Sequence, residues 1–284
     1  MVRGSCLCGD VAWEVTGDLR LMTHCHCSMC RKAHGSAFAT YLAADRDEFR
    51  VVRGAERIRR YASSPEMDRF FCARCGSVLP GDSGEAEVFM PAGGLDDDPG
   101  LRPEAHIFVA SKAPWHEIHD DLPRFDAYPE VFDAKEVEGP RAAAAREGSV
   151  GGSCLCGAVA YELDGALELI VDCHCSRCRK SRGAAYAANL LVRSSQLRWL
   201  RGEADVSSYR APDAVRFVCR FCRVCGSKLP RVDDERGLAI VPAGTLDQDP
   251  GARERIHIFT GSKAAWYEIT DALPRFEAEP PGAV

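Results

Sequence analysis

The cysteines are the side chains of this sequence best suited to chemistry, and there are fifteen of them in 284 residues. Fourteen fall into two copies of one pattern, which runs from a CxC pair through a CxCxxC cluster to a CxxC pair. Thiolates bind soft metal ions, exchange disulfides or undergo oxidation. The N-terminal residues show no secretory signal pattern and the cysteine count is odd, so disulfides are disfavoured and metal binding is the leading interpretation.

Two of the cysteine pairs in each copy predict a closed zinc site. A CxxC pair followed by glycine has the spacing of a zinc knuckle, and residues i and i+2 of a CxC pair point to the same face of an extended segment. A redox CxxC is the alternative. The predicted four-cysteine sites are made by Cys6, Cys8, Cys72 and Cys75 and by Cys154, Cys156, Cys222 and Cys225.

The CxCxxC clusters supply only three sulfurs each. His26 and His174 lie between two ligand cysteines and should point to the opposite face, so no fourth ligand is evident. Three protein ligands with an open position are typical of catalytic zinc, although a distant His, Asp or Glu could close the site and make it structural. We therefore predict four zinc ions per chain, two in each domain. The predicted open sites are made by Cys25, Cys27 and Cys30 and by Cys173, Cys175 and Cys178.

The pattern repeats as a unit of domain size. GSCLCG, CHCSxCRK, FCxxCGS and HIFxxSKAxW each occur twice in the same order, displaced by 148 to 151 residues. A repeat of this length indicates a tandem duplication, with domains at 1–135 and 149–284 joined by a linker at 136–148. The two copies could form an internal pseudo-dimer.

The two copies differ beside the three-cysteine clusters. When the two copies are aligned, His24 corresponds to Asp172 and His34 corresponds to Arg182. These differences weigh against identical substrates for the two copies. Cys219 has no counterpart in the first copy and is interpreted as a buried or incidental thiol.

Each copy is predicted to be a small, mainly β domain that relies on metal to complete its core. No sustained 3.6-residue apolar stripe is present, and short β-rich runs are bounded by glycine or proline. These runs are 11–15, 87–90 and 106–108, then 159–163, 238–241 and 257–259.

Charge and hydropathy exclude several classes of partner. The net charge is −6, the sequence pI is about 5.8, and no Lys/Arg run occurs, which argues against nucleic acid. No window approaches the ~18 apolar residues of a membrane span. We expect a soluble, cytoplasmic chain. Basic residues beside the clusters, at 31, 32, 74, 179, 180 and 223, would offset thiolate charge or suit an anionic ligand, or are solvated surface charges.

With these four motifs in this order, each copy closely resembles the glutathione-dependent formaldehyde-activating enzyme (GFA) family, which includes the centromere protein V type. The resemblance implies a β-tent fold, structural zinc on the four-cysteine sets and reactive zinc on the three-cysteine sets. It also implies carbon–sulfur lyase chemistry, which condenses glutathione with formaldehyde to S-hydroxymethylglutathione or runs in reverse. The expected partners are a small thiol such as glutathione and a small aldehyde.

Other residues have weaker claims to a role. His106 and His257 could shuttle a proton, although a packed core histidine is the simpler interpretation. The aromatic residues of the last motif, Trp115, Trp266, Phe108 and Phe259, could line a substrate pocket or pack in the core. Two functions from other classes stay open: a non-catalytic zinc scaffold for protein interaction, and a thiol redox sensor.

Overall fold

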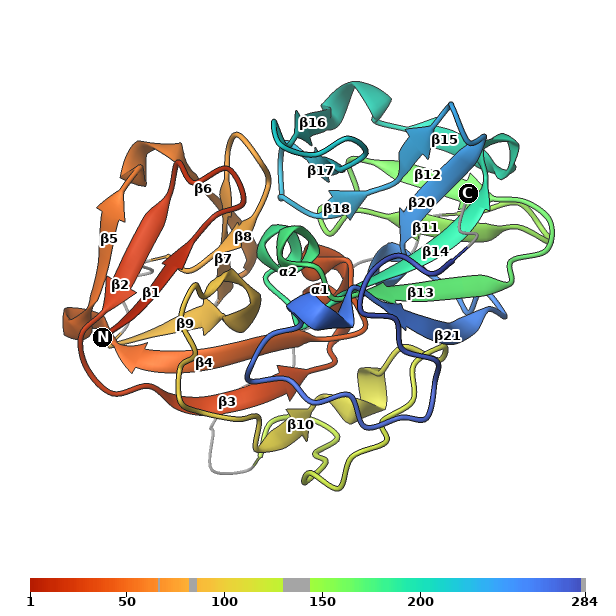
Figure 1. The fold of residues 1–284 in the computed structure, drawn as a ribbon. Helices are drawn as coiled ribbons and strands as arrows, with labels where there is room; N and C mark the ends of the chain where they lie inside the picture. The colour runs from red at the N-terminus through yellow and green to blue at the C-terminus, as the bar shows by residue number, and fades with distance from the viewer. Residues whose placement is uncertain (66, 82–85, 130–143, 282–284) are drawn as a thin grey trace.

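The computed structural model describes residues 1–65, 67–81, 86–129 and 144–281 (Figure 1). Within them the chain is mainly β, which confirms the predicted fold class. Residues 136–143 of the predicted linker lie outside the described residues.

The described residues of the first half form three sheets. Its strands are β1 (Val2–Ser5), β2 (Ala12–Val15), β3 (Arg20–Cys25), β4 (Ala39–Asp45), β5 (Phe49–Arg53), β6 (Ile58–Ser64), β7 (Met67–Cys72), β8 (Val78–Leu79), β9 (Glu87–Pro91) and β10 (Ala105–Ile107). Their orders are β1-β2-β5, β6-β7-β8 and β10-β3-β4-β9. β10 runs parallel to β3, and the other pairs are antiparallel.

The described residues of the second half repeat this arrangement, with one further strand at the edge of the largest sheet. Its strands are β11 (Val150–Ser153), β12 (Ala160–Leu163), β13 (Leu169–Cys173), β14 (Ala187–Arg193), β15 (Leu197–Arg201), β16 (Val206–Arg210), β17 (Val218–Cys222), β18 (Lys228–Leu229), β19 (Arg231–Asp233), β20 (Leu238–Pro242) and β21 (Arg253–Ile258). Their orders are β11-β12-β15, β16-β17-β18 and β19-β20-β14-β13-β21.

Helices are short in both halves. Among the described residues the α-helices are α1 (Ser28–His34) and α2 (Ser176–Arg182), and each begins after the second cysteine of a CxCxxC cluster and contains the third. They were missed from the sequence because seven residues are too few to show a helical stripe. The 3-10 helices are Arg46–Glu48, Ala55–Arg57, Ala92–Gly94, Val109–Ser111, Ser194–Gln196, Glu203–Asp205, Ala243–Thr245 and Thr260–Ser262.

Alternating burial is seen in some of these strands, such as β2 and most of β20. In β2, Trp13 and Val15 are buried while Ala12 and Glu14 are partly exposed. Such alternation places one face of each strand in the core. Trp13 lies against Gly4 and Gly94, where a Cβ would come within 3.0 Å of its ring.

The two halves pack together around α1 and α2 at the centre of the molecule (Figure 1). Phe71 of β7 and Phe221 of β17 meet edge to face, with ring centroids 6.3 Å apart. Each ring also covers a glycine of the other half: a Cβ on Gly76 would lie 2.4 Å from Phe221, and one on Gly226 would lie 2.6 Å from Phe71. Reciprocal contacts of this kind are those of a two-fold related pair.

Two lysines reach across the seam between the halves. Lys32 of α1 donates to Ser153 Oγ at 2.8 Å and pairs with Asp247 at 2.5 Å. At the equivalent place in α2, Lys180 donates to Ser5 Oγ at 2.6 Å and pairs with Asp96. These lysines follow the cluster cysteines in sequence, yet each binds the opposite half rather than its own cluster.

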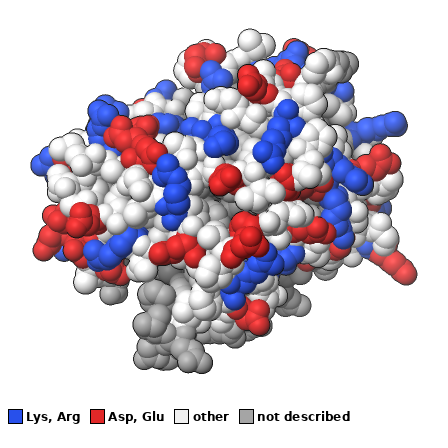
Figure 2. Space-filling model, turned by 60° about the horizontal axis from the view of Figure 1, so that its bottom comes forward, with Lys and Arg blue, Asp and Glu red and all other residues white. Residues whose placement is uncertain are grey.

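On the face turned forward in Figure 2, basic and acidic side chains are interspersed without a broad area of one sign. Across the described residues, no helix has the length and apolar character needed to cross a bilayer.

Candidate functional site

The structure brings the four-cysteine sets together in both halves. In the first, Cys6 and Cys8 Sγ lie 3.4 Å apart, and Cys8 and Cys72 Sγ lie 3.8 Å apart. In the second half the matching separations are also 3.4 and 3.8 Å. All four sulfurs of each set, including Cys75 and Cys225, lie within 4.8 Å of one another.

The donor set and its spacing fit zinc. All fifteen cysteines are free thiols. A tetrahedral ion with Zn–S bonds of about 2.3 Å places its sulfurs about 3.8 Å apart, which is close to the separations seen. Each four-cysteine cluster could therefore hold a metal ion with no further ligand.

Local backbone contacts position these sulfurs. The Val11 amide donates to Cys6 Sγ at 3.3 Å. The Leu7 amide donates to Ser77 Oγ at 3.0 Å, which ties the CxC loop to the turn that follows β7. Gly76 closes that turn with φ 69°, a left-handed conformation that favours glycine. The second half repeats these contacts with Val159, Leu155, Ser227 and Gly226.

The three-cysteine sets form where a strand runs into a helix. Cys25 ends β3, and Cys27 caps α1 by accepting from the Cys30 amide at 3.3 Å. The three sulfurs lie within 4.8 Å of one another, and Cys173, Cys175 and Cys178 do the same at α2. In the described residues no fourth His, Cys, Asp or Glu joins either group. Each could hold a metal ion and leave one position open.

A cation and a phenol surround the first three-cysteine cluster. The Arg69 guanidinium donates to Cys30 Sγ at 3.7 and 3.8 Å and to the Tyr41 hydroxyl at 3.5 Å. That hydroxyl also bonds His34 Nε2 at 2.7 Å. Phe108 packs against the same cluster. The result is a mostly buried thiolate site with one arginine in contact.

The cysteine thiols and the Arg69 guanidinium shift the pKa values of Cys30 and Arg69. Hydrogen bonds from the Cys25 and Cys27 thiols, and then the Arg69 guanidinium, hold the pKa of Cys30 well below its usual range. Burial lowers the pKa of Arg69, but the adjacent Cys30 thiolate raises it, and the net shift is upward. Arginine and thiolate thus stabilise each other's charged forms.

The second three-cysteine cluster has other neighbours. Cys219 replaces Arg69, and its Sγ lies 3.0 Å from Ser181 Oγ. Arg182 replaces His34, but it donates to Asn189 Oδ1 and to the Gly35 carbonyl of the first half, both at 2.9 Å. Among the described residues, no arginine side chain donates a hydrogen bond to these sulfurs. The odd cysteine of the sequence is thus a buried thiol beside this cluster, outside its set of three.

In the second cluster the thiol with the lowered pKa is at a different position, the middle cysteine instead of the last. Hydrogen bonds from Cys173 and Cys178 lower the pKa of Cys175 to about 3, while those from Cys173 and Cys175 raise the pKa of Cys178. Cys175 and Cys178 are both half-buried, whereas in the first cluster only Cys27 is. The second cluster is therefore the more open of the two.

A histidine chain lies on the opposite side of β3 from the sulfurs. His26 Nε2 bonds His106 Nδ1 at 2.8 Å, and His106 Nε2 bonds Asp120 at 2.9 Å. His174, His257 and Asp271 repeat the chain at 2.9 Å for both steps. Burial lowers the pKa of His26 and, to about 3, that of His174. As alternation predicts, His26 and His174 point away from the cysteines and are fully buried, while His106 and His257 also line the cavity between the halves.

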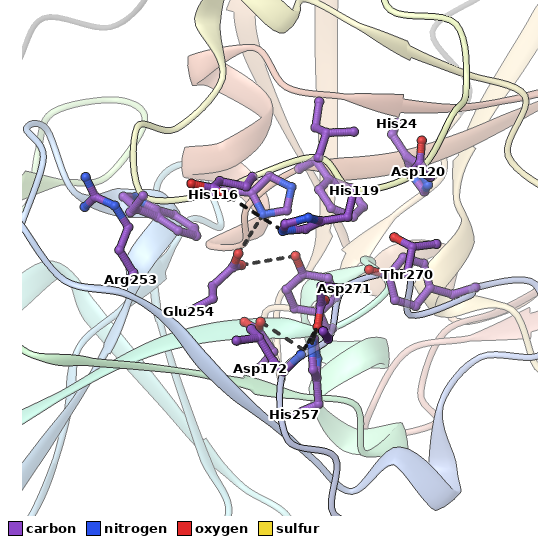
Figure 3. Close-up of a pocket in the computed structure, with 18 of the residues that line it drawn as sticks. His24, His116, His119, Asp120, Asp172, Arg253, Glu254, His257, Thr270 and Asp271 are labelled. Atoms are coloured by element: carbon purple, nitrogen blue, oxygen red, sulfur yellow. Dashed lines mark hydrogen bonds and ion pairs between the residues drawn. The ribbon is translucent and has the colours of Figure 1, made fainter.

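A cavity of about 330 Å³ lies on the seam between the halves (Figure 3). The first half contributes His24, Phe38, Trp115 and His116, and the second contributes Asp172, Tyr186, Glu254 and Tyr267. Although the halves are related by duplication, one wall is rich in imidazole and the other in carboxyl and phenol groups. Burial, together with Glu254 and Asp271, raises the pKa of Asp172 well above its usual range.

Several of these residues could not be identified from the sequence. Arg69 and Tyr41 approach Cys30 only because separate strands bring them there, and Glu254 meets His116 only across the seam. The one available signal was a mismatch between the copies, such as arginine against cysteine at 69 and 219. The tryptophans of the last motif are buried, and Trp115 also lines the cavity.

Comparison with known proteins finds one family. The model of the glutathione-dependent formaldehyde-activating enzyme family matches residues 1–111 and 149–262. A putative glutathione-dependent formaldehyde-activating enzyme of Halomonas elongata is 36% identical over 128 residues, 42% of this chain and 81% of the relative. An uncharacterized lyase of Schizosaccharomyces pombe is 30% identical over 77 residues, 27% of this chain and 54% of the relative.

Among solved structures, a Rhodobacter sphaeroides protein is 30% identical, with a TM-score of 0.29 and coverage of 36% of this chain and 91% of that one. The two family segments take in most of the sequence, one in each half, and contain all four cysteine groups. The chain therefore belongs to the glutathione-dependent formaldehyde-activating enzyme family.

Proposed function

We propose that this chain is a zinc-dependent carbon–sulfur lyase that joins the thiol of glutathione, or of a similar small thiol, to formaldehyde or another small aldehyde. In the forward direction a C–S bond forms, the carbonyl becomes a hydroxyl, and the thiol proton ends on that oxygen. The reverse reaction releases thiol and aldehyde. The names of the Halomonas and other relatives support glutathione and formaldehyde as the substrates.

The observation that carries the proposal is the unequal number of sulfurs in the two kinds of cluster. Four sulfurs complete a tetrahedron, whereas three leave a position for a substrate sulfur or oxygen. Zinc would be held by Cys25, Cys27 and Cys30 and by Cys173, Cys175 and Cys178, with structural zinc on the four-cysteine sets. When bound at the open sets, zinc supplies a Lewis acid that lowers the pKa of a thiol and polarises a carbonyl.

The residues around the first open set support this chemistry. Arg69 places a positive charge 3.7 Å from Cys30 Sγ, where it offsets the charge of the thiolate ligands. Phe108 and Tyr128 pack together with centroids 4.6 Å apart beside the cluster and limit the entry of water. The His26, His106 and Asp120 chain acts behind the strand, where it holds the cysteine loop in place rather than touching substrate.

Exchange NMR tests the reaction directly. Formaldehyde and glutathione are mixed at equilibrium with the zinc-loaded chain, and exchange between free aldehyde and the S-hydroxymethyl adduct is measured. We expect the chain to speed exchange well above the protein-free rate. The double variant Cys27→Ser with Cys175→Ser should return exchange to that rate, because each open set loses a ligand.

The matched control is Cys219→Ser, which removes a buried thiol that belongs to none of the four sets. It should keep both exchange and the zinc content. An exchange rate with the wild-type chain equal to that without protein would refute the lyase proposal. Zinc analysis gives a separate check, since the proposal requires close to four ions per chain.

A further inference from the structure

The cavity on the seam between the halves is separate from the cysteine clusters. His24 lines it and is followed at once by Cys25, and Asp172 lines it and is followed by Cys173. Because successive residues of a strand point to opposite faces of a sheet, the cavity lies across β3 and β13 from the sulfurs. What binds there is therefore independent of the lyase chemistry proposed above.

Glu254 faces this cavity without an arginine or lysine partner among the described residues. It accepts hydrogen bonds from His116 Nδ1 at 2.8 Å and from the Tyr186 hydroxyl at 3.2 Å (Figure 3). The arginine on the cavity wall, Arg253, is already paired with Asp249 at 2.9 Å. A carboxylate in this position attracts positive charge into the cavity.

Asp172 supplies a second acceptor, and one of its carboxyl oxygens lacks a hydrogen-bond partner among the described residues. Its side chain is only 1% exposed, and its Oδ1 has no hydrogen-bond partner in the part of the chain that the structure describes. Its Oδ2 lies 3.9 Å from His257 Nδ1 (Figure 3). Leaving a buried polar atom unpaired costs free energy, so such an atom calls for an explanation. Asp172 lines the cavity, so a ligand that donates to its carboxyl group would supply a missing hydrogen bond.

Aromatic rings line the cavity next to these carboxyl groups. Phe38, Tyr186 and Tyr267 pack with centroid separations of 5.6, 5.7 and 6.3 Å. Ring faces attract cations within about 6 Å and also cover hydrocarbon. The cavity volume, about 330 Å³, is that of a site for a small organic molecule.

The site exists only because the two copies have diverged. The position of Asp172 is occupied in the first copy by His24, and that of Glu254 by Pro103. A symmetric pair of identical copies would place either two imidazoles or four carboxyl groups here. At these positions the tandem chain instead has the single imidazole of His24 on one wall and the carboxyl groups of Asp172 and Glu254 on the other.

We propose that this cavity binds a small organic molecule that carries a primary ammonium group. The ammonium donates to the carboxyl groups of Glu254 and Asp172, and the attached carbon atoms pack against the aromatic rings. A metal ion fits less well, since no three His, Asp or Glu side chains of the described cavity wall bring ligand atoms within 4.8 Å of one another. An ammonium group on a flexible chain reaches acceptors that lie further apart.

Calorimetric titration of the zinc-loaded full chain tests the proposal, with no thiol or aldehyde present. The probe is benzylammonium, and its neutral isostere benzyl alcohol reports how much the charge contributes. We expect saturable binding of one benzylammonium per chain, and binding of benzyl alcohol weaker by about tenfold or more. Glu254→Gln should weaken benzylammonium by a similar factor, whereas the matched exposed change Glu235→Gln should leave it unaltered.

The outcomes separate this proposal from the lyase proposal. Glu254→Gln should keep the thiol exchange rate, because Glu254 lies away from the sulfurs. Benzylammonium that fails to saturate, or that binds Glu254→Gln as well as wild type, overturns the ammonium site. Saturable Mg²⁺ binding in place of benzylammonium also overturns it. If Glu254→Gln does not fold, equal affinity of the wild-type chain for benzylammonium and benzyl alcohol is the result that overturns it.

Discussion

The two closed cysteine clusters are near copies of each other, while the two open clusters have different neighbours. In the closed clusters the same sulfur pairs lie 3.4 and 3.8 Å apart in both halves, and the same amides donate to them. In the open clusters the three cysteines are equivalent, but their neighbours differ. The position of Arg69 in the first half is occupied by Cys219 in the second, and that of Tyr41 is occupied by Asn189.

This difference separates what holds the fold from what is free to specialise. A closed cluster joins two loops of a small β domain, so a change in any neighbour that moves a sulfur weakens the fold itself. An open cluster keeps its three sulfurs on one short stretch of chain, and its surroundings can change without breaking it. In the first open cluster Arg69 thus donates a hydrogen bond to a ligand sulfur, whereas in the second two of the thiols, Cys175 and Cys178, are more exposed.

The largest expected effect follows loss of a closed-cluster ligand. Cys72→Ser and Cys222→Ser should each unfold their own half, because structural zinc contributes about 10–16 kcal/mol against a total stability of about 5–15 kcal/mol. Zinc should fall from about four ions to about two, since the open cluster of that half is lost as well. Metal analysis and thermal unfolding measure this. Unequal effects of the two variants would contradict the equivalence of the closed clusters.

Next in size is the difference between the two lysines that cross the seam. Lys32 and Asp247 are 5% and 1% exposed, whereas Lys180 and Asp96 are 23% and 35% exposed. Removing the cation of a buried pair costs about 3–5 kcal/mol, and an exposed pair contributes about 1 kcal/mol or less. Denaturant unfolding should therefore rank Lys32→Met as much the more destabilised. Equal losses of unfolding free energy for Lys32→Met and Lys180→Met would show that the two ion pairs contribute equally and would contradict this prediction.

The third prediction concerns pH. Burial lowers the pKa of His34 from 6.5 to about 4, so the unfolded chain takes up a proton before the folded chain does. The stability from His34 is present above pH 6.5 and is lost as the pH falls towards 4. One pKa unit is about 1.36 kcal/mol, which gives a loss of about 2 kcal/mol between pH 7.5 and 5.

His34→Gln should flatten the pH dependence of unfolding by this amount, with zinc present throughout. Arg182, at the same position of the second half, titrates far above this range and contributes none of it. The control His119→Gln changes a histidine that is 44% exposed. If the slope of His34→Gln between pH 7.5 and 5 matches that of wild type, the assignment is wrong.

The grouping of the cysteines could be predicted from the sequence because pairs of candidate metal ligands follow local spacing rules. Two sulfurs three residues apart need only a turn, and the duplication shows which pairs recur. Contacts that depend on sheet order were out of reach: Arg69 and Cys30 are 39 residues apart, and Lys32 and Asp247 are 215 apart. Lys32 was interpreted as a cluster or surface charge because its neighbours in sequence are cysteines, but α1 turns it towards the other half.

The smallest expected effect tests whether Arg69 accounts for the difference between the open clusters. In a Cys175→Ser background, where only the first open set is intact, Arg69→Met should lower thiol exchange about tenfold, as is typical when a residue supporting a metal ligand is lost. Because Arg69 stabilises the Cys30 thiolate, the pH at which exchange rises should also move upward, a shift that a purely structural role would not produce. Arg69→Lys keeps the charge and should recover part of the rate. Zinc content and thermal unfolding are measured alongside. A fall in rate matched by a loss of zinc, with no change in the pH profile, would mean that Arg69 supports only packing and that the open clusters differ for another reason.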